Sequence, residues 1–237
     1  MDGFAKGKVL VMGPKKSGKT RVANFLSGHE EQPDFSSAYK PTKGTRILEF
    51  EESVQSGKGR GVQLNVELWD CSGDEQYNNC CMRHTRACLV LSTHDEATLL
   101  AFSRASPLLM PPSLPPLFCP PGPAILRDVS GVVLVYDPST KEQEKDIETW
   151  YKSFVARLGL KDEQVLLFAH QAQATSRSAY QAPRNLDRFR FLNTTLDSEE
   201  STQAMRQTFS QFLSAVAAAV MDKSNADMDE SLALASR

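Results

Sequence analysis

The most constraining feature of the sequence is the segment 13–20, which reads GPKKSGKT and fills the pattern G-x-x-x-x-G-K-[ST] at every fixed position. The apolar run 9–12 precedes it, and apolar residues at helical spacing follow it in a predicted helix at 19–27. A phosphate-binding loop requires this order of strand, loop and helix. A glycine-rich turn that contains a lysine by chance would need neither neighbour. The segment therefore predicts a P-loop.

Each residue type in this loop has a role in binding phosphate. Gly13 and Gly18 allow the backbone to curl, so that successive N–H groups face an anion at the positive end of a helix dipole. Lys19 is expected to reach the β- and γ-phosphates, and Thr20 to offer its hydroxyl to Mg²⁺. The candidate nucleotide-binding residues of the loop are Gly13, Pro14, Lys15, Lys16, Ser17, Gly18, Lys19 and Thr20.

The composition is that of a globular protein of one or two domains: 237 residues, 41% hydrophobic, with a net charge of −2. Because no strong positive field or long apolar run is present, we expect no nucleic-acid partner and no direct membrane anchor. The termini show neither a signal peptide nor a lipidation motif. The five cysteines lack zinc-ligand spacing and are expected to be free thiols.

Strand and helix patterns alternate along the chain, which indicates an α/β fold. Strands are predicted at 8–13, 45–51, 62–69, 131–137, 164–169 and 188–192, and helices at 19–27, 142–158 and 198–221. No helix fits between 45–51 and 62–69, so these two strands are predicted to form an antiparallel hairpin. The remaining sheet is predicted to be parallel and doubly wound, because its strands read as continuous apolar runs.

A second nucleotide motif follows the strand 62–69. Asp70 lies at the strand end, three residues before Gly73, which suits water-mediated Mg²⁺ contact and a backbone N–H near the γ-phosphate. Trp69-Asp70-x-x-Gly73 resembles the D-x-x-G box of small GTPases in its Rab-like form, and Pro41-Thr42-x-Gly44 resembles their switch I motif. The resemblance implies that Thr42, together with Thr20 and Asp70, contacts the metal.

Several stretches together resemble the Rab-like protein 5 family, the small-GTPase-like subunit of the intraflagellar transport B complex. They are 13–26, 41–50, 68–74 and 123–128. The resemblance implies one small-GTPase-like domain formed by 1–80 and 123–221, which binds GTP or GDP with Mg²⁺. It also implies coiled-coil subunits of the B complex as partners, and a place in the cytoplasm, the cilium and the ciliary base.

Asp74 stands where Ras-like enzymes carry the glutamine that orients the attacking water. We therefore expect slow or absent hydrolysis and assign no catalytic residue.

The base-recognition motifs of a working GTPase are altered as well. His170-Gln171-Ala172-Gln173 replaces the N-K-x-D motif, so the charged hydrogen bond to guanine is lost. The S-A-K loop is replaced by 193–195. His170, Gln171 and Gln173 are the candidate base-side residues.

Segment 81–122 interrupts the scheme, inside switch II. Eight of the 13 prolines fall between 107 and 123, a density that blocks helices and central strands. One hypothesis is a disordered insertion; the other is a translated intron that ends in a pyrimidine-rich splice tract. The length of the cDNA between codons 80 and 123 distinguishes the two. The acidic tail 222–237 is expected to be disordered.

Three functions follow from these motifs. The first is a structural subunit of the transport particle that holds nucleotide. The second is a regulatory GTPase that cycles with helper proteins, and the third is another P-loop enzyme such as an ATP-using kinase. The hairpin and the motifs at Thr42 and Asp70 favour the first two, and Asp74 favours the first.

Overall fold

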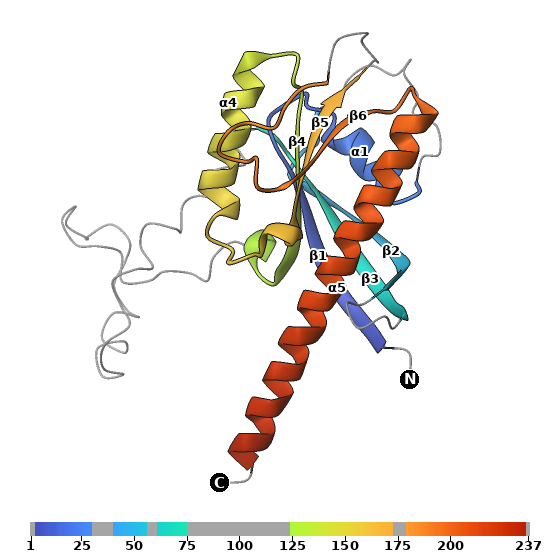
Figure 1. Ribbon diagram of the computed structural model, residues 1–237. Helices are drawn as coiled ribbons and strands as arrows, with labels where there is room; N and C mark the ends of the chain where they lie inside the picture. The colour runs from blue at the N-terminus through green and yellow to red at the C-terminus, as the bar shows by residue number, and fades with distance from the viewer. Residues whose placement is uncertain (1–2, 30–39, 56–60, 75–123, 173–178, 236–237) are drawn as a thin grey trace, which may run out of the picture.

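A six-stranded sheet with one antiparallel pair forms the centre of the computed structural model, which describes residues 3–29, 40–55, 61–74, 124–172 and 179–235. Its order is β2-β3-β1-β4-β5-β6, and only β2 and β3 run antiparallel (Figure 1). The strands are β1 (Gly3–Met12), β2 (Thr45–Gln55), β3 (Gly61–Cys71), β4 (Val129–Tyr136), β5 (Val165–Gln171) and β6 (Arg190–Thr195). This arrangement confirms the predicted fold class, including the hairpin.

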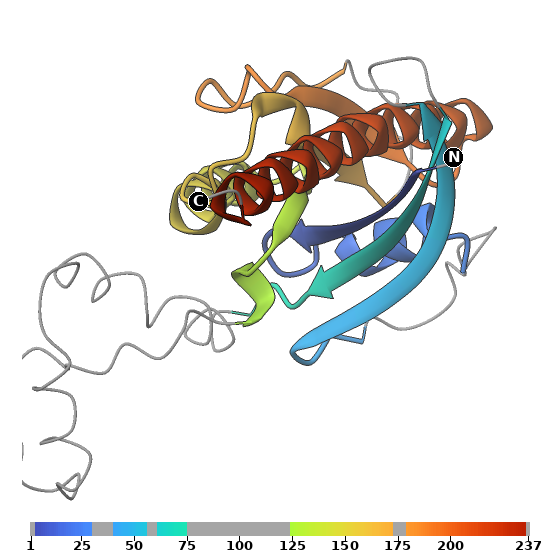
Figure 2. The ribbon, with the colours of Figure 1, turned by 90° about the horizontal axis from the view of Figure 1, so that it is seen from below.

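Helices cover both faces of the sheet. They are α1 (Lys19–Leu26), α4 (Lys141–Trp150) with its π-helical continuation η2 (Tyr151–Val155), α5 (Glu199–Ala235) and the short 3₁₀ turns η1 (Ala124–Leu126) and η3 (Asp162–Gln164). Hydrophobic contacts place α1 and α5 on one face and α4 with η2 on the other. Figure 2 shows α5 lying obliquely across one face of the sheet.

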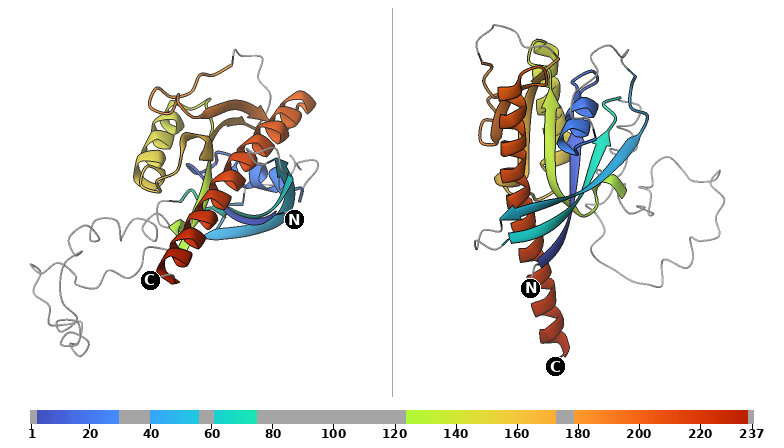
Figure 3. Two further views of the ribbon diagram at one scale, coloured as in Figure 1. Left: turned by 60° about the horizontal axis from the view of Figure 1, so that its bottom comes forward. Right: turned by 90° about the vertical axis from the view of Figure 1, so that its right-hand side faces the viewer.

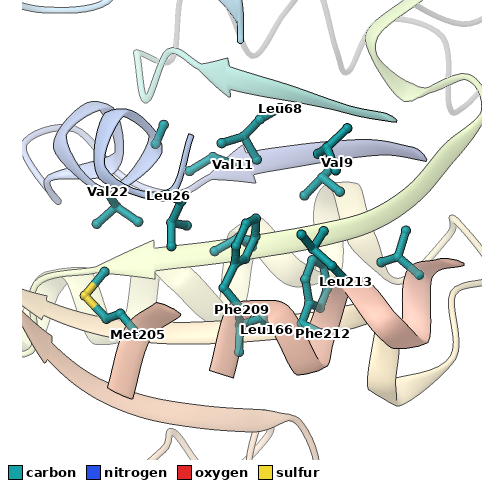
Figure 4. Close-up of a cluster of buried hydrophobic side chains, with 14 of the residues drawn as sticks. Val9, Val11, Val22, Leu26, Leu68, Leu166, Met205, Phe209, Phe212 and Leu213 are labelled. Carbon is teal, nitrogen blue, oxygen red and sulfur yellow. The ribbon is translucent and has the colours of Figure 1, made fainter. Parts of the chain in front are cut away.

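The alternation of side chains along each strand divides the core into two layers. In β1, Val9 and Val11 face α1 and α5, whereas Leu10 and Met12 face α4. The first layer is closed by residues of α5 at helical spacing, among them Phe212, which is 1% exposed (Figure 4). Both layers are continuous beneath the carboxyl ends of the strands, so the loops at that edge rest on a rigid base.

The last helix is longer than the sequence analysis predicted. The segment 222–235, expected to be part of a disordered tail, continues α5 as far as Ala235 and extends beyond the sheet (Figure 1, Figure 3). Neither glycine nor proline interrupts 199–235, and the stretch contains many alanine, leucine, methionine and glutamate residues with high helix propensity. Within the described part of the chain, no helix combines the length and hydropathy needed to cross a membrane.

Several strands, among them β1, β2 and β6, extend past their predicted boundaries because strand pairing continues beyond their apolar cores. β1 begins at Gly3, which pairs with Val62 of β3, although its first residues show no apolar run. β6 reaches Thr195 through pairing with Gln171. β3 in segment 61–74 and β4 in segment 124–172 flank β1 in the sheet. The predicted insertion 81–122 lies outside the described residues.

Candidate functional site

A cavity of about 630 Å³ opens at the carboxyl edge of the parallel strands, where such folds place their ligands. It is bordered by the P-loop, the segment before β2, the residues after β3, and the ends of β4 and β5. Its lining residues are Lys15, Lys16, Ser17, Gly18, Lys19, Thr20, Arg21, Asn24, Lys40, Pro41, Thr42, Ser72, Gly73, Asp74, Asp137, His170 and Ala172. Three segments far apart in sequence, around residues 15–20, 40–42 and 72–74, therefore meet at one site.

The two glycines of the P-loop are required by its geometry. Gly13 has a φ of 147°, and a Cβ atom there would lie 2.0 Å from the carbonyl oxygen of Val135. Gly18, the N-cap of α1, has a φ of 83°, and its Cβ would lie 2.4 Å from Cδ2 of His170. The loop can lie this close to Val135 of β4 and His170 of β5 only because neither position carries a side chain.

Lys19 is buried within the loop, with 7% of its surface exposed. Its Nζ donates hydrogen bonds to the carbonyl oxygen of Pro14 at 2.5 Å and to Oγ of Ser17 at 3.3 Å. Burial lowers the pKa of Lys19 to about 8, although the nearby Asp70 carboxylate acts in the opposite direction. An ammonium with so little solvent is electrostatically undercompensated, and an anionic ligand would supply the missing negative charge.

The three predicted metal residues come together beside Lys19. Oγ1 of Thr20 lies 2.8 Å from Oγ1 of Thr42 and donates to Oδ2 of Asp70 at 2.9 Å. Asp70 is fully buried, with Arg46 Nη2 at 3.6 Å from Oδ2, and burial raises the pKa of this carboxyl. Its other oxygen, Oδ1, has no hydrogen-bond partner among the described residues.

This oxygen set fits Mg²⁺. The ion prefers oxygen ligands and keeps several waters, so one carboxylate and two hydroxyls suffice on the protein side. The unpartnered Oδ1 of Asp70 is the kind of buried acceptor that a metal-bound water would satisfy. Thr20, Thr42 and Asp70 therefore form the candidate metal site.

The segment after β3 packs directly on the P-loop. A Cβ at Gly73 would lie 2.6 Å from the carbonyl carbon of Pro14 and 2.7 Å from both the Lys15 nitrogen and the Lys19 Nζ. Only glycine fits between these groups. The next residue, Asp74, forms an ion pair with Lys15, with Oδ2 3.0 Å from Nζ.

On the base side, the structure brings one of three predicted residues into the cavity. His170 is 3% exposed, contacts Gly18, and lies with its Nδ1 3.1 Å from Oγ1 of Thr194. Gln171 ends β5 and is not among the described residues that line the cavity. Gln173 lies outside the described residues, so its role at the base stays a prediction. His170 thus joins β5, β6 and the P-loop.

Sequence reasoning missed several lining residues. Asp137 follows β4, and its backbone N–H donates to Gln143 Oε1 at 2.9 Å, while Gln143 Nε2 donates to the Lys15 carbonyl at 3.2 Å. This chain of contacts holds the P-loop against α4. The position of Asp137 at the carboxyl end of a predicted parallel strand could have indicated it. Arg46 is not among the lining residues, but it contacts Asp70 and donates to Asn24 Oδ1. Its position in the sequence did not indicate this role.

Burial of His170 predicts a pH-dependent stability. Burial lowers its pKa to about 4, with Asp137 opposing the shift and Arg21 adding to it. Between pH 6.5 and 4 the unfolded chain binds a proton that the folded chain does not, so this contribution to stability is lost as pH falls through that range. The free energy of unfolding should be about 1 kcal/mol lower at pH 5.5 than at pH 7.5 from this group alone.

Urea unfolding of wild type and His170→Asn at both pH values measures this contribution. The variant should show a flatter pH dependence of the free energy of unfolding than wild type does. Equal slopes for wild type and His170→Asn would contradict the assignment.

Comparison with known proteins places the chain in a family. No protein-family model matches the chain. The intraflagellar transport protein 22 homolog of Danio rerio is 30% identical over 214 residues, which cover 89% of this chain and 90% of the relative. The homolog of Homo sapiens is 28% identical over 213 residues with the same coverage. The intraflagellar transport associated protein 2 of Caenorhabditis elegans is 27% identical over 177 residues, covering 63% of this chain and 54% of the relative.

Solved structures share the fold. The crystal structure of T. brucei IFT22/74/81 in its GTP-bound form contains a chain 25% identical to this one, with a TM-score of 0.51 and coverage of 89% and 98%. GDP-bound T. brucei IFT22 is 24% identical, with a TM-score of 0.51 and coverage of 88% and 96%. The resemblance to Rab-like protein 5, first indicated by the P-loop and switch motifs, is thereby confirmed, and the chain belongs to the intraflagellar transport protein 22 family.

Proposed function

We propose that this chain binds a guanine nucleotide with Mg²⁺ in the cavity at the P-loop. The observation that carries the proposal is the buried carboxylate of Asp70, which lies against the hydroxyls of Thr20 and Thr42 and has one oxygen without a partner. Mg²⁺, when bound, supplies positive charge to the β- and γ-phosphates. The backbone N–H groups of 13–20 and the ammonium of Lys19 would hold the phosphates.

Guanine, rather than adenine, is favoured by the family. T. brucei IFT22 has GTP-bound and GDP-bound crystal structures. In this chain His170 occupies the first position of the base motif and is fixed by Thr194, so the end of β5 is well ordered for a base. No carboxylate stands at Gln173, and we expect weaker selection of guanine than a charged hydrogen bond would give.

We infer that hydrolysis is slow, because Asp74 replaces the amide that would orient water. Its carboxylate is engaged with the Lys15 ammonium at 3.0 Å. A carboxylate beside a phosphate also repels the charge that develops in the reaction. The nucleotide would then act as a long-lived ligand that stabilises the P-loop and the segments at 40–42 and 72–74.

The role that fits a long-lived nucleotide is that of a structural subunit of the intraflagellar transport B particle. The T. brucei relative occurs in an IFT22/74/81 crystal structure. We propose that this chain likewise binds coiled-coil subunits of the particle and acts in the cytoplasm, at the ciliary base and in the cilium, without a membrane anchor of its own. Its net charge of −2 provides no strong positive field for nucleic acid, which is consistent with a protein partner.

Identification of the nucleotide that stays bound during native purification tests the proposal. The full chain is purified in Mg²⁺ buffer without added nucleotide, denatured at intervals, and analysed by ion-exchange chromatography. We expect guanine nucleotide near one equivalent, with GTP persisting for hours. ATP or an empty site would contradict guanine binding. Rapid conversion of GTP to GDP would contradict slow hydrolysis and favour a regulatory cycle.

A further inference from the structure

We propose that Lys15 and Asp74 discriminate between nucleoside triphosphate and diphosphate. The inference rests on the proposed nucleotide binding and adds a specificity-determining pair to that site. Lys15 belongs to the P-loop and Asp74 to the segment after β3, and both line the cavity. Their charged atoms are 3.0 Å apart, so the pair bridges the two segments at the mouth of the site.

The position of Gly73 indicates which part of a nucleotide this pair would meet. A Cβ at Gly73 would lie 2.7 Å from Nζ of Lys19, so the backbone of residue 73 lies against the ammonium that is expected to hold the outer phosphates. Asp74 is the next residue, and its carboxylate meets the ammonium of Lys15 in the P-loop. A terminal phosphate held by Lys19 therefore has the Lys15–Asp74 pair as its neighbour, whereas the phosphates nearer the ribose do not.

The charges of Lys15 and Asp74 determine how the pair responds to a bound terminal phosphate. Asp74 carries one negative charge and has 27% of its side chain exposed, while Lys15 is 55% exposed and can turn toward another anion. A terminal phosphate carries more than one negative charge and three acceptor oxygens, so it competes successfully with a single carboxylate for the ammonium. The terminal phosphate of a triphosphate binds the Lys15 ammonium and is repelled by the Asp74 carboxylate. A diphosphate has no phosphate group at this position, so the Lys15–Asp74 ion pair stays formed.

The two residues thus have opposite effects on triphosphate affinity and small effects on diphosphate affinity. Gly73, clamped between Pro14 and Lys19, cannot move away from the loop without losing its contacts, so Asp74 stays near the phosphate. The ratio of GDP to GTP dissociation constants is the quantity that the pair sets. Exposed ion pairs typically change an equilibrium by up to about five-fold, which fixes the expected scale.

Isothermal titration of the nucleotide-free full chain with GTP and with GDP, both in Mg²⁺, tests the pair. Asp74→Asn should strengthen GTP binding by roughly five-fold, and Lys15→Met should weaken it by roughly five-fold, with GDP affinity within about two-fold of wild type in both. Lys15→Arg should restore the wild-type ratio. The double variant should bind GTP more tightly than Lys15→Met, because it lacks the repulsion by Asp74, and its departure from the product of the single effects measures the coupling between the two residues.

Lys6→Met is the matched control, since Lys6 forms a 2.6 Å ion pair with Glu67 away from the cavity and should change neither affinity. Equal changes in GTP and GDP affinity for the two site variants would overturn the inference, because they would mean that the pair only shapes the loop. Unchanged affinities would overturn it as well. A wild-type chain that binds neither nucleotide would overturn the proposed function itself.

Discussion

Lys19→Ala is expected to weaken both GTP and GDP binding by at least about 100-fold, since a desolvated charge paired with phosphate contributes several kcal/mol. Lys19 is held inside the P-loop by the carbonyl of Pro14 and the hydroxyl of Ser17, where a phosphate oxygen would find it with little solvent to displace. Isothermal titration in Mg²⁺ measures the loss. Lys141→Ala, at an exposed lysine that begins α4, is the control and should bind as wild type does.

Lys19 is expected to favour nucleotide binding but to lower the stability of the nucleotide-free protein. Because burial lowers the pKa of Lys19 to about 8, its ammonium destabilises the empty fold at neutral pH. From pH 8 to 10.5 the unfolded chain keeps a proton that the folded chain has lost, so wild-type stability should rise with pH in that window. Lys19→Ala should lack this rise and should unfold no earlier than wild type at pH 7. A variant that binds nucleotide normally, or that fails to fold, would contradict this account.

The same variant tests whether binding to the partners in the transport particle requires bound nucleotide. If Lys19→Ala loses nucleotide yet still binds the proposed coiled-coil partners, the nucleotide does not organise the partner surface. Loss of both would support a structural role for the bound nucleotide.

Gly13→Ala is expected to abolish measurable nucleotide binding and to lower the free energy of unfolding by about 3 kcal/mol or more. The added Cβ would lie 2.0 Å from the carbonyl oxygen of Val135. That oxygen belongs to a central strand, where Val135 pairs with Phe168 of β5 and cannot move aside. The P-loop would have to move away from β4. Urea unfolding and nucleotide titration of the same sample measure both effects.

Gly28→Ala separates steric overlap from backbone preference. Gly28 also has a positive φ, 72°, but nothing lies within 4 Å of a Cβ placed there. We expect a cost of about 1 kcal/mol from the backbone conformation alone, with nucleotide affinity unchanged. Similar losses in the two variants would show that the overlap with Val135 is not the cause.

The sequence predicted most of the fold because its signals are local. The continuous apolar runs of β4 and β5 and the glycine-rich hairpin connection each fall within a few residues. The differences lie at element ends. β1 starts at Gly3 because β3 offers it a partner, and α5 continues to Ala235 through a segment whose acidic composition had indicated disorder. Strand pairing across the sheet and helix continuation both outweigh local composition.

The sequence by itself determined the P-loop, since the identities and spacing of Gly13, Lys19 and Thr20 follow from phosphate chemistry. It predicted Asp70 as a metal residue from its place at a strand end, and Thr42 from the resemblance to small GTPases. Only the tertiary structure decided what surrounds them. The Lys15–Asp74 pair joins residues 59 positions apart (74 − 15). His170 in β5 contacts Gly18 in the loop after β1, although β4 lies between these two strands in the sheet. Such contacts depend on which strands are neighbours and where each one ends, and the one-dimensional pattern does not contain that information.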